Sequence, residues 1–388
     1  MKIVIAPDSF KGSLSAFEVA KSIQKGILNI DKSIETVIVP MADGGEGTVQ
    51  SLIDASGGEI VELMVHDPLF RKIKSFYGIM GDGKTAVIEM AAASGLPLLT
   101  SAERNPLKTT TYGTGELIKD ALSRGCQKFI IGLGGSATND GGCGMAQALG
   151  AKFLDEDENE VGFGGGELLK IKTIDISGID NRIKSAEFLA ACDVDNPLCG
   201  GKGASAVFAP QKGASETDVK TLDSGLNHFA DLVKYELYID IKNVAGAGAT
   251  GGLGAGAMIF LKARLKSGIE IVSRETSLAE KMEGADLLIT GEGKIDFQTT
   301  FGKTPFGVAQ IAKEKNIPVI AIAGSLGEGY QTLYDKGFDE IHSIMDKSMS
   351  LKHAIENAAE LLENAAEDVV RNWIKKKTSE SETINLKE

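Results

Sequence analysis

The segment 2-KIVIAPDSFKGSLSAFE-18 opens the chain with a strand, a loop and a helix. Lys2–Ala6 is a short, β-branched apolar run ended by a proline, which indicates a buried strand. Ser15 and Glu18 have the S-x-x-E spacing of a capping box, and apolar residues then recur at helical spacing as far as Ile27. A strand followed by a helix is the first unit of a layered α/β fold.

The same strand-and-helix alternation continues along the chain. Thr36–Pro40 predicts a second strand and Pro318–Ala323 a buried one. Further short strands are expected at 128–131, 188–191, 238–241 and 286–290. We therefore expect an α/β fold in which a doubly wound, Rossmann-like domain has a second α/β domain inserted in it. The expected limits are 1–65 with 280–375 for the first domain, 66–279 for the insert, and 376–388 for a polar tail that frays.

Composition excludes several classes of protein. The formal net charge of −13 and the absence of a Lys/Arg stripe argue against nucleic-acid binding. The four cysteines lack paired C-x-x-C spacing, which favours a reduced, cytoplasmic compartment over a zinc site. The apolar start is too short for a signal peptide, and no run approaches the roughly 20 apolar residues of a membrane span. A homodimer is compatible with the sequence, which does not determine the oligomeric state.

Three glycine-rich loops carry carboxylates: Met41–Thr48 (MADGGEGT), Gly132–Gly144 (GLGGSATNDGGCG) and Thr290–Asp296 (TGEGKID). Glycine lets backbone N–H groups close around phosphate oxygens, and nearby acids are explained if a divalent cation lies between them and the phosphates. In the second loop, Ser136 and Thr138 either hydrogen-bond phosphate or cap the helix that follows. The loops predict a phosphate-handling enzyme.

Two familiar glycine motifs can be interpreted only from the strands and helices expected on either side of them. Residues 78–85 (GIMGDGKT) match the P-loop pattern, but 85–90 favours a strand and Gly-Asp-Gly a hairpin tip, so we expect a hairpin and no P-loop. Residues 246–251 (GAGATG) fit the dinucleotide fingerprint without an acidic residue about 20 positions later. A phosphate-contacting turn and a close-packed helix entry are equally good explanations, ahead of dinucleotide binding.

Other acids and cations also have two interpretations. If strand geometry continues beyond residue 191, the side chains of Asp193 and Asp195 point the same way. Such a pair can bind Mg²⁺ or accept a proton from a hydroxyl. The alternative is that they form an Asx-turn before the proline. The acids and lysine of 292–296 follow a predicted strand, where α/β folds bind ligands, or form a solvated turn. Lys11 and Arg71 border loops, although most isolated cations are simply solvated.

Taken together and in this order, eight blocks resemble the type I glycerate kinases, the glycerate 2-kinase family. They are APDSFKGSLSA (6–16), MADGGEGT (41–48), AAASGLPLL (91–99), TTTYGTGELI (109–118), GLGGSATNDGG (132–142), ACDVDNPLCG (191–200), GAGATGGLGAG (246–256) and TGEGKID (290–296). The resemblance spans residues 1 to about 373. It implies transfer of phosphate from ATP, with Mg²⁺, to the 2-hydroxyl of D-glycerate, on a two-domain α/β fold with the active site in the cleft between domains.

The resemblance also selects motif positions, to which we add roles from the chemistry of phosphoryl transfer. The family's motif positions are Asp8, Ser9, Lys11, Asp43, Glu46, Thr111, Asp140, Asp193, Asp195, Asn196, Glu292, Lys294 and Asp296. Phosphoryl transfer needs a cradle, a metal, a cation and an acceptor base. We assign Asp193, Asp195 and Lys11 to catalysis, with Asp193 the favoured base, and Asp8, Ser9, Arg71, Thr111 and Asn196 to substrate. Gly134, Gly135, Ser136, Thr138, Gly248, Gly251 and Lys294 are assigned to ATP, and Asp43, Glu46, Asp140, Glu292 and Asp296 to metal.

Two alternatives belong to other classes. A nicotinamide-dependent dehydrogenase of a small hydroxy acid would use residues 246–251 and bind NAD without needing ATP. A nucleotide sensor would bind ATP and never consume it. Cofactor titration separates the dehydrogenase from the kinase, and ADP release separates the sensor.

Overall fold

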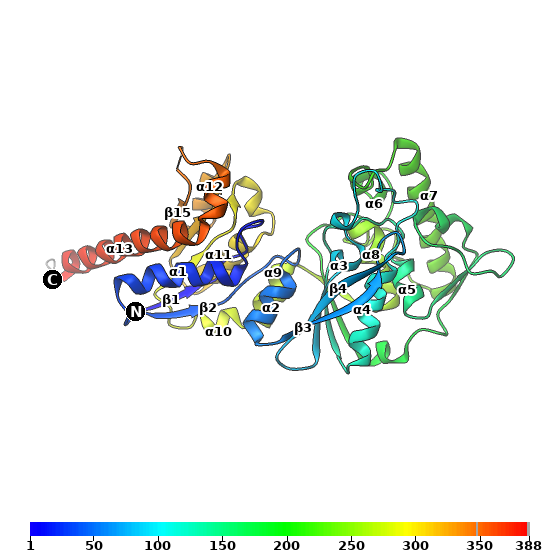
Figure 1. The fold of residues 1–388 in the computed structure, drawn as a ribbon, viewed down its shortest axis with the longest axis horizontal. Coiled ribbons are helices and arrows are strands. Elements are labelled where there is room, and N and C mark those ends of the chain that lie inside the picture. The colour runs from blue at the N-terminus through cyan, green and yellow to red at the C-terminus, as the bar shows by residue number, and fades with distance from the viewer. Residues whose placement is uncertain (347, 386–388) are drawn as a thin grey trace. The chain divides into compact units, whose positions relative to one another are not determined.

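The chain folds into two compact units of mixed helix and strand. The computed structural model describes residues 1–346 and 348–385. Unit 1 comprises Met1–Asp43, Gln50–Ala55 and Val272–Glu388, and unit 2 comprises Gly44–Val49 and Ser56–Ile271. The domain limits predicted at 65/66, 279/280 and 375/376 stay predictions. The α/β class is confirmed by the parallel strands and their helices (Figure 1).

The helices and strands have the following bounds. The helices are α1 (Ala16–Ile30), α2 (Thr48–Ser56), α3 (Ala91–Ser94), α4 (Tyr112–Ser123), α5 (Cys143–Ala148), α6 (Ala204–Phe208), α7 (Glu216–Leu237), α8 (Ala249–Phe260), α9 (Gly268–Glu275), α10 (Leu278–Lys281), α11 (Thr304–Glu314), α12 (Leu351–Glu356) and α13 (Ala358–Asn385). Two small sheets are formed by β7 (Lys152–Leu154) with β8 (Thr173–Asp175), and by β12 (Lys294–Ile295) with β14 (Ser325–Leu326).

Unit 1 is built on a parallel sheet. Its strand order is β15-β13-β11-β1-β2, with β1 at Lys2–Ile5, β2 at Glu35–Ile38, β11 at Leu287–Thr290, β13 at Val319–Ala323 and β15 at Glu340–Ser343. The chain passes from β1 to β2 on one side, and β11 lies on the other side. The strand order therefore reverses between β1 and β11, and in open α/β sheets ligands bind beyond the carboxyl ends of the strands at such a point.

The first helix forms as its sequence predicts. The Ser15 hydroxyl accepts from the Glu18 N–H at 3.3 Å, and the Glu18 carboxylate accepts from the Ser15 N–H at 2.8 Å, which completes the capping box. The buried face of α1 then packs on α13, which runs beside it (Figure 1). A Cβ at Gly26 would lie 2.2 Å from the Glu363 carbonyl oxygen, so the two helices approach closely because this residue is a glycine.

We expect Ser15→Ala to lower the free energy of unfolding of unit 1 by about 1 kcal/mol, because the N-cap hydroxyl satisfies a helix N–H that would otherwise lack a partner. Urea unfolding followed by circular dichroism measures this. Ser22→Ala, about two turns further along the helix at a partly exposed position, is the control and should change stability by less than about 0.5 kcal/mol. Equal effects of the two changes would mean that the cap contributes nothing.

Unit 2 is built on a mixed sheet. Its order is β10-β9-β6-β5-β4-β3, with β3 at Glu59–His66, β4 at Lys72–Ile79, β5 at Thr85–Glu89, β6 at Lys128–Gly132, β9 at Glu187–Ala191 and β10 at Arg264–Lys266. β5, β6, β9 and β10 are parallel, whereas β4 pairs antiparallel with both β3 and β5. Residues 80–84 join the antiparallel strands β4 and β5, so the predicted hairpin is confirmed and the P-loop match has no helix after it.

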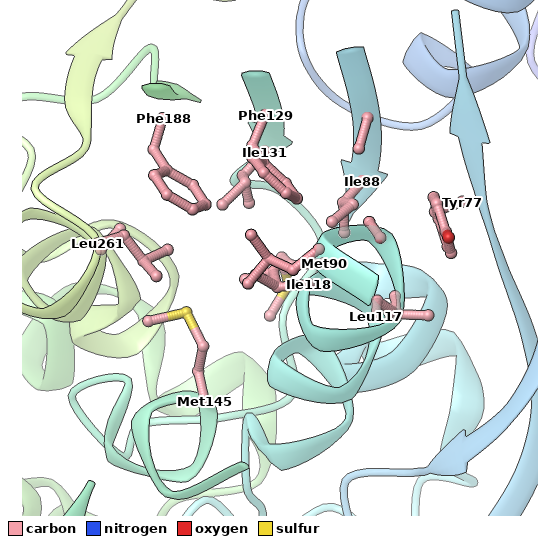
Figure 2. Close-up of a cluster of buried hydrophobic side chains, with 14 of the residues drawn as sticks. Tyr77, Ile88, Met90, Leu117, Ile118, Phe129, Ile131, Met145, Phe188 and Leu261 are labelled. Atoms are coloured by element: carbon pink, nitrogen blue, oxygen red, sulfur yellow. The ribbon is translucent and has the colours of Figure 1, made fainter. Parts of the chain in front are cut away.

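The core of unit 2 holds the parallel strands against α4 and α5 (Figure 2). Phe129 and Phe188, from the adjacent strands β6 and β9, stack with ring centroids 4.6 Å apart. They face Ile118 of α4 and Met145 of α5, and all four side chains are buried. This packing fixes the carboxyl ends of β6 and β9, from which the glycine-rich and acidic loops begin.

Two predicted details differ in the structure. The strand expected at 238–241 is absent, because α7 ends at Tyr238 in the left-handed region (φ 59°) and a loop follows. Three of the four residues of 238–241 are apolar, which is the composition of a short buried strand. A run of four residues is too short to distinguish such a strand from a loop that buries one side chain, as this loop buries Ile241. At the other end, α13 continues through most of the predicted frayed tail, of which residues 386–388 lie outside the described residues. Within the described ranges, we find no helix that is both long and apolar enough to cross a membrane.

Candidate functional site

Two loops of unit 2 begin at the carboxyl ends of neighbouring strands of its sheet. They are the glycine-rich loop of residues 132–144, and the acidic loop that carries Asp193 and Asp195. β6 and β9 are adjacent and parallel, with Gly132 paired with Ala191, so the loops that follow leave side by side. The Leu133 N–H donates to the Ala191 carbonyl at 3.1 Å, which extends this pairing into the glycine-rich loop. The sheet therefore brings the predicted phosphate cradle next to the segment that carries Asp193.

A cavity of about 300 Å³ lies beside this loop. It is lined by Leu96, Leu133, Gly134, Gly135, Ser136, Val194, Phe208, Gln211, Lys212, Ala249 and Thr250. The predicted cradle residues Gly134, Gly135 and Ser136 thus share one cavity with Val194, the neighbour of Asp193. Apolar walls with a few polar groups are typical of a small-molecule site.

The loop of residues 246–251 packs directly against the glycine-rich loop of residues 132–144. The Gly141 N–H donates to the Gly251 carbonyl at 3.1 Å, and a Cβ at Gly251 would lie 2.0 Å from the Thr138 carbonyl oxygen. A Cβ at Gly248 would lie 2.2 Å from the Pro197 carbonyl oxygen. These glycines allow backbones to touch, as the close-packed interpretation of 246–251 requires. The element before them is the helix α7 and not a strand, so the context of a dinucleotide fingerprint is missing.

Lys212 is a buried cation that the sequence gives no reason to select. It is 1% exposed, and its Nζ donates to the Ser136 hydroxyl and to the Thr138 carbonyl, each at 2.7 Å. Among the residues that the structure describes, no carboxylate lies within ion-pair distance of this ammonium group. Burial lowers the pKa of Lys212 to about 7, and the negative charge of Asp140 opposes this only in part.

Three buried polar atoms near the two glycine-rich loops lack partners. Over the described residues, the Thr138 Oγ1, the Asn139 Oδ1 and the Thr250 Oγ1 accept and donate no hydrogen bond. Thr250 lines the cavity and lies in the left-handed region (φ 53°), which is costly for a β-branched residue. Buried polar atoms normally find a partner, and unpaired ones mark sites that a ligand or water completes.

The depressed pKa of Lys212 predicts a pH dependence of stability. The unfolded lysine titrates near 10.5 and the folded one near 7, so between these values the unfolded chain binds more protons and stability rises with pH. The slope from this group is up to about 1.4 kcal/mol per pH unit. Subtracting the unfolding free energies of Lys212→Met from those of the wild type, at pH 7 to 10, isolates the effect. A difference that is flat across this range would contradict the prediction.

Asp140 and Thr111 organise the glycine-rich loop. The Asp140 Oδ2 accepts from the Thr111 N–H at 2.8 Å and from the Thr111 hydroxyl at 2.9 Å, and its Oδ1 accepts from the Gly142 N–H at 3.1 Å. Burial raises the pKa of Asp140, while these hydrogen bonds lower it. Because both carboxylate oxygens already accept from protein donors, the geometry favours a role in holding the loop over the predicted metal ligation.

The acidic loop is exposed. β9 ends at Ala191, so strand geometry does not continue to Asp193 and Asp195, and the argument that they point the same way does not apply. The Asp193 Oδ1 accepts from the Gly268 N–H at 3.1 Å. The Asn196 side chain donates to the Lys202 carbonyl at 2.8 Å. Asp193 and Asp195 are thus solvent-accessible carboxylates on a loop that hydrogen bonds anchor.

Two other predicted residues of unit 2 have local explanations. Arg71 pairs with Asp67 and Glu103, each at 2.6 Å, so its charge is compensated within the protein. Glu46 is exposed in the first glycine-rich loop, and the Gly47 N–H beside it donates to the Glu89 carboxylate at 3.0 Å. Neither residue lines the cavity beside Gly134.

In unit 1, acids follow three adjacent strands. Asp8 follows β1, Asp43 follows β2 and Glu292 follows β11, at the sheet edge where the strand order reverses. The Asp8 carboxylate accepts from the Thr304 hydroxyl and from the Ser9 N–H, each at 2.6 Å. Burial, and then the charge of Asp43, raise the pKa of Asp8 to about 7. The charge of Glu292 adds to this shift, so the structure concentrates negative charge at this edge.

The acids of unit 1 fit part of a magnesium site. Glu292 accepts from Thr299 at 2.7 Å and from Lys303 at 3.2 Å, while Asp296 pairs with Lys294 at 3.0 Å. Within residues 1–346 and 348–385, no three His, Cys, Asp or Glu side chains are placed together to hold a metal. Mg²⁺ is commonly held by one or two carboxylates together with substrate phosphates and water. The negative charge shared by Asp8, Asp43 and Glu292 fits such a partial site.

Lys11 borders a second, smaller cavity. This cavity, of about 160 Å³, lies between the loop after β1 and the loop after β11 and is lined by Lys11, Ser13 and Gly293, with apolar residues including Phe10, Ile344 and Leu351. The structure therefore brings two of the predicted motifs of unit 1 together, APDSFKGS and TGEGKID.

Comparison with known proteins gives matches over nearly the whole chain. The profile of the glycerate kinase family matches residues 3–374. Glycerate kinase of Bacillus subtilis (strain 168) is 52% identical over 369 residues, which cover 95% of this chain and 97% of the relative. Glycerate 2-kinase of Escherichia coli (strain K12) is also 52% identical, with the same coverage. A crystal structure from Salmonella typhimurium LT2, provisionally named glycerate kinase 2, has a TM-score of 0.90 and 48% identity, covering 97% of this chain and 99% of that chain.

Proposed function

Since the chain belongs to the glycerate kinase family, we propose that it transfers the γ-phosphoryl group of ATP to the 2-hydroxyl of D-glycerate, giving 2-phosphoglycerate and ADP. It is an enzyme, because relatives about half identical to it over nearly their full length are glycerate kinases. The choice of the 2-hydroxyl is supported by the E. coli relative, whose name specifies that position.

One observation carries the proposed chemistry: the cavity of about 300 Å³ in unit 2. It has the glycine-rich loop on one side and Val194, next to Asp193, on the other. Phosphoryl transfer is mainly a matter of positioning and charge neutralisation, so a donor cradle beside an acceptor base is the arrangement it needs. In this proposal Gly134, Gly135 and Ser136 bind the phosphates, and Asp193 accepts the proton of the attacking hydroxyl.

The residues of unit 1 support the substrate and the metal in this proposal. Asp8 and Ser9 remain the proposed contacts of glycerate, whose hydroxyl groups can hydrogen-bond with a carboxylate and with a serine hydroxyl. Asp43 and Glu292 would hold Mg²⁺, which neutralises charge on the phosphates when it is bound. Lys11 supplies a local positive charge in a chain whose net charge of −13 repels anions.

The test is ³¹P NMR of the product after incubation of the protein with D-glycerate, ATP and Mg²⁺. The expected result is a 2-phosphoglycerate resonance that grows in step with ADP. A 3-phosphoglycerate resonance would support kinase activity but contradict phosphorylation at the 2-hydroxyl. If ATP is consumed and no phosphorylated glycerate forms, D-glycerate is not the phosphate acceptor. If ATP and D-glycerate both remain unchanged, ATP is not the phosphate donor. The dehydrogenase alternative has no structural observation in its favour, because 246–251 follows a helix.

A further inference from the structure

We infer that Lys212 is a phosphate-binding residue of this enzyme, which holds the phosphates of the nucleotide directly and through the hydroxyl of Ser136. The inference rests on the proposed use of ATP and goes beyond it, because Lys212 belongs to none of the motifs that carry the family resemblance. Lys212 would supply the positive charge that a phosphate-binding loop needs and that residues 132–144 do not contain.

The first argument is electrostatic. A buried ammonium group without an ion-pair partner is costly, because it has lost its water and gained no opposite charge. Lys212 is 1% exposed and, in the described part of the chain, its Nζ contacts only the Ser136 hydroxyl and the Thr138 carbonyl. Both partners are neutral. An anion in the adjoining cavity, which Lys212 itself lines, supplies the missing charge.

The second argument concerns hydrogen-bond direction. An ammonium group has three N–H donors, of which two are used within the protein at 2.7 Å each. Since Lys212 donates to the Ser136 oxygen, the Ser136 hydroxyl proton must point toward another acceptor. Ser136 lines the same cavity as Gly134 and Gly135. Lys212 therefore orients Ser136 as a donor toward the position where the glycine-rich loop would hold phosphate.

The third argument is independent of Lys212. The Thr250 Oγ1 is buried, lines the same cavity and is without a hydrogen-bond partner among the described residues. The cavity wall thus offers an ammonium group and two hydroxyl donors, from three separate segments of the chain. A ligand rich in acceptor oxygens and negative charge satisfies all of them, as a nucleotide phosphate does.

The experiment is calorimetric titration of the full-length protein with ADP and Mg²⁺ in the absence of glycerate. Lys212→Met keeps the length of the side chain and removes its charge. We expect it to weaken ADP binding by about 30-fold or more, which corresponds to loss of a charge-assisted contact. Lys220→Met is the matched control, because Lys220 is an exposed lysine of α7 in the same unit, and it should bind ADP like the wild type.

Two further variants keep the inference testable if Lys212→Met fails to fold. Thr250→Val preserves shape and removes the unpartnered hydroxyl, and Ser136→Ala removes the hydroxyl that Lys212 orients. Each should weaken ADP binding by about 10-fold with an unchanged KM for glycerate. Thr250→Val should also leave the melting temperature unchanged, because the hydroxyl it removes has no partner among the described residues, a combination that a merely structural role would not produce.

The outcomes separate this inference from the proposed function. Wild-type affinity for ADP in Lys212→Met, or in both hydroxyl variants, overturns the role of Lys212 and leaves ATP use intact. If the wild-type protein itself binds no ADP, the proposed use of ATP is wrong and the role of Lys212 is wrong with it.

Discussion

Asp193→Asn should lower turnover by roughly 10²–10⁴-fold, the usual contribution of a general base. Asp193 is exposed on the loop that follows β9, and its neighbour Val194 lines the cavity beside the glycine-rich loop. Asparagine has nearly the same shape but cannot accept the proton of a hydroxyl. Its amide oxygen can still accept from the Gly268 N–H, which the Asp193 carboxylate does at 3.1 Å, so the loop should stay anchored. ADP release at saturating glycerate and ATP measures the effect.

Asp195→Asn tests the second carboxylate of this loop that is assigned to catalysis. Asp195 is exposed two residues away, and if Asp193 is the base, Asp195→Asn should lower turnover less than Asp193→Asn does. If Asp195→Asn loses turnover and Asp193→Asn does not, the base is Asp195. Normal turnover in both variants would remove this loop from proton transfer altogether.

Gly251→Ala should destabilise unit 2 by about 4 kcal/mol or more. The residue has φ 70°, which costs an alanine about 1–2 kcal/mol, and its Cβ would lie 2.0 Å from the Thr138 carbonyl oxygen. That contact cannot be relieved without moving the glycine-rich loop, since the Gly141 N–H donates to Gly251 and Thr138 accepts from Lys212. We therefore expect loss of ADP binding together with the lower stability.

Gly83→Ala separates the backbone effect from the collision. Gly83 has φ 68° at the tip of the hairpin between β4 and β5, and a Cβ there would meet no atom within 4 Å. It should cost only about 1–2 kcal/mol and leave ADP binding unchanged. Urea unfolding of both variants gives the comparison. Equal losses would show that positive φ, and not the close approach of the two loops, explains the glycine at 251.

Local patterns in the sequence predicted the elements whose causes are local. The capping box of α1 depends on residues three apart, and the hairpin at 80–84 depends on Gly-Asp-Gly between apolar strands, so each is visible in a short window. The family motifs likewise selected the loop residues Gly134–Ser136, which line the cavity. Of the two equally good explanations of 246–251, close packing against a neighbouring backbone is supported by the approach of Gly251 to the Thr138 carbonyl.

Features that depend on distant contacts were not predictable in this way. Lys212 reaches Ser136, which is 76 positions away in the chain, and nothing in its own segment distinguishes it from a solvated lysine. Arg71 was selected as a cation for substrate, but its charge is taken up by Asp67 and by Glu103, 32 positions on. The buried position of Asp140 was also invisible, because only the fold surrounds that carboxylate with backbone donors. In each case tertiary contacts determine what the side chain can do.

The order of synthesis has a consequence for the sheet of unit 1. Its first strand, β1, emerges from the ribosome early, but its partner β11 pairs Leu287 with Ile3 and is made some hundreds of residues later. Unit 2 is nearly continuous in sequence and contains all the strands of its own sheet, so it can fold while β1, already able to pair with β2, still lacks β11 on its other side. Contacts between such distant segments form slowly, and unpaired apolar strands are prone to aggregate in the meantime. The nascent chain should therefore depend on chaperones until β11 and β13 have been translated.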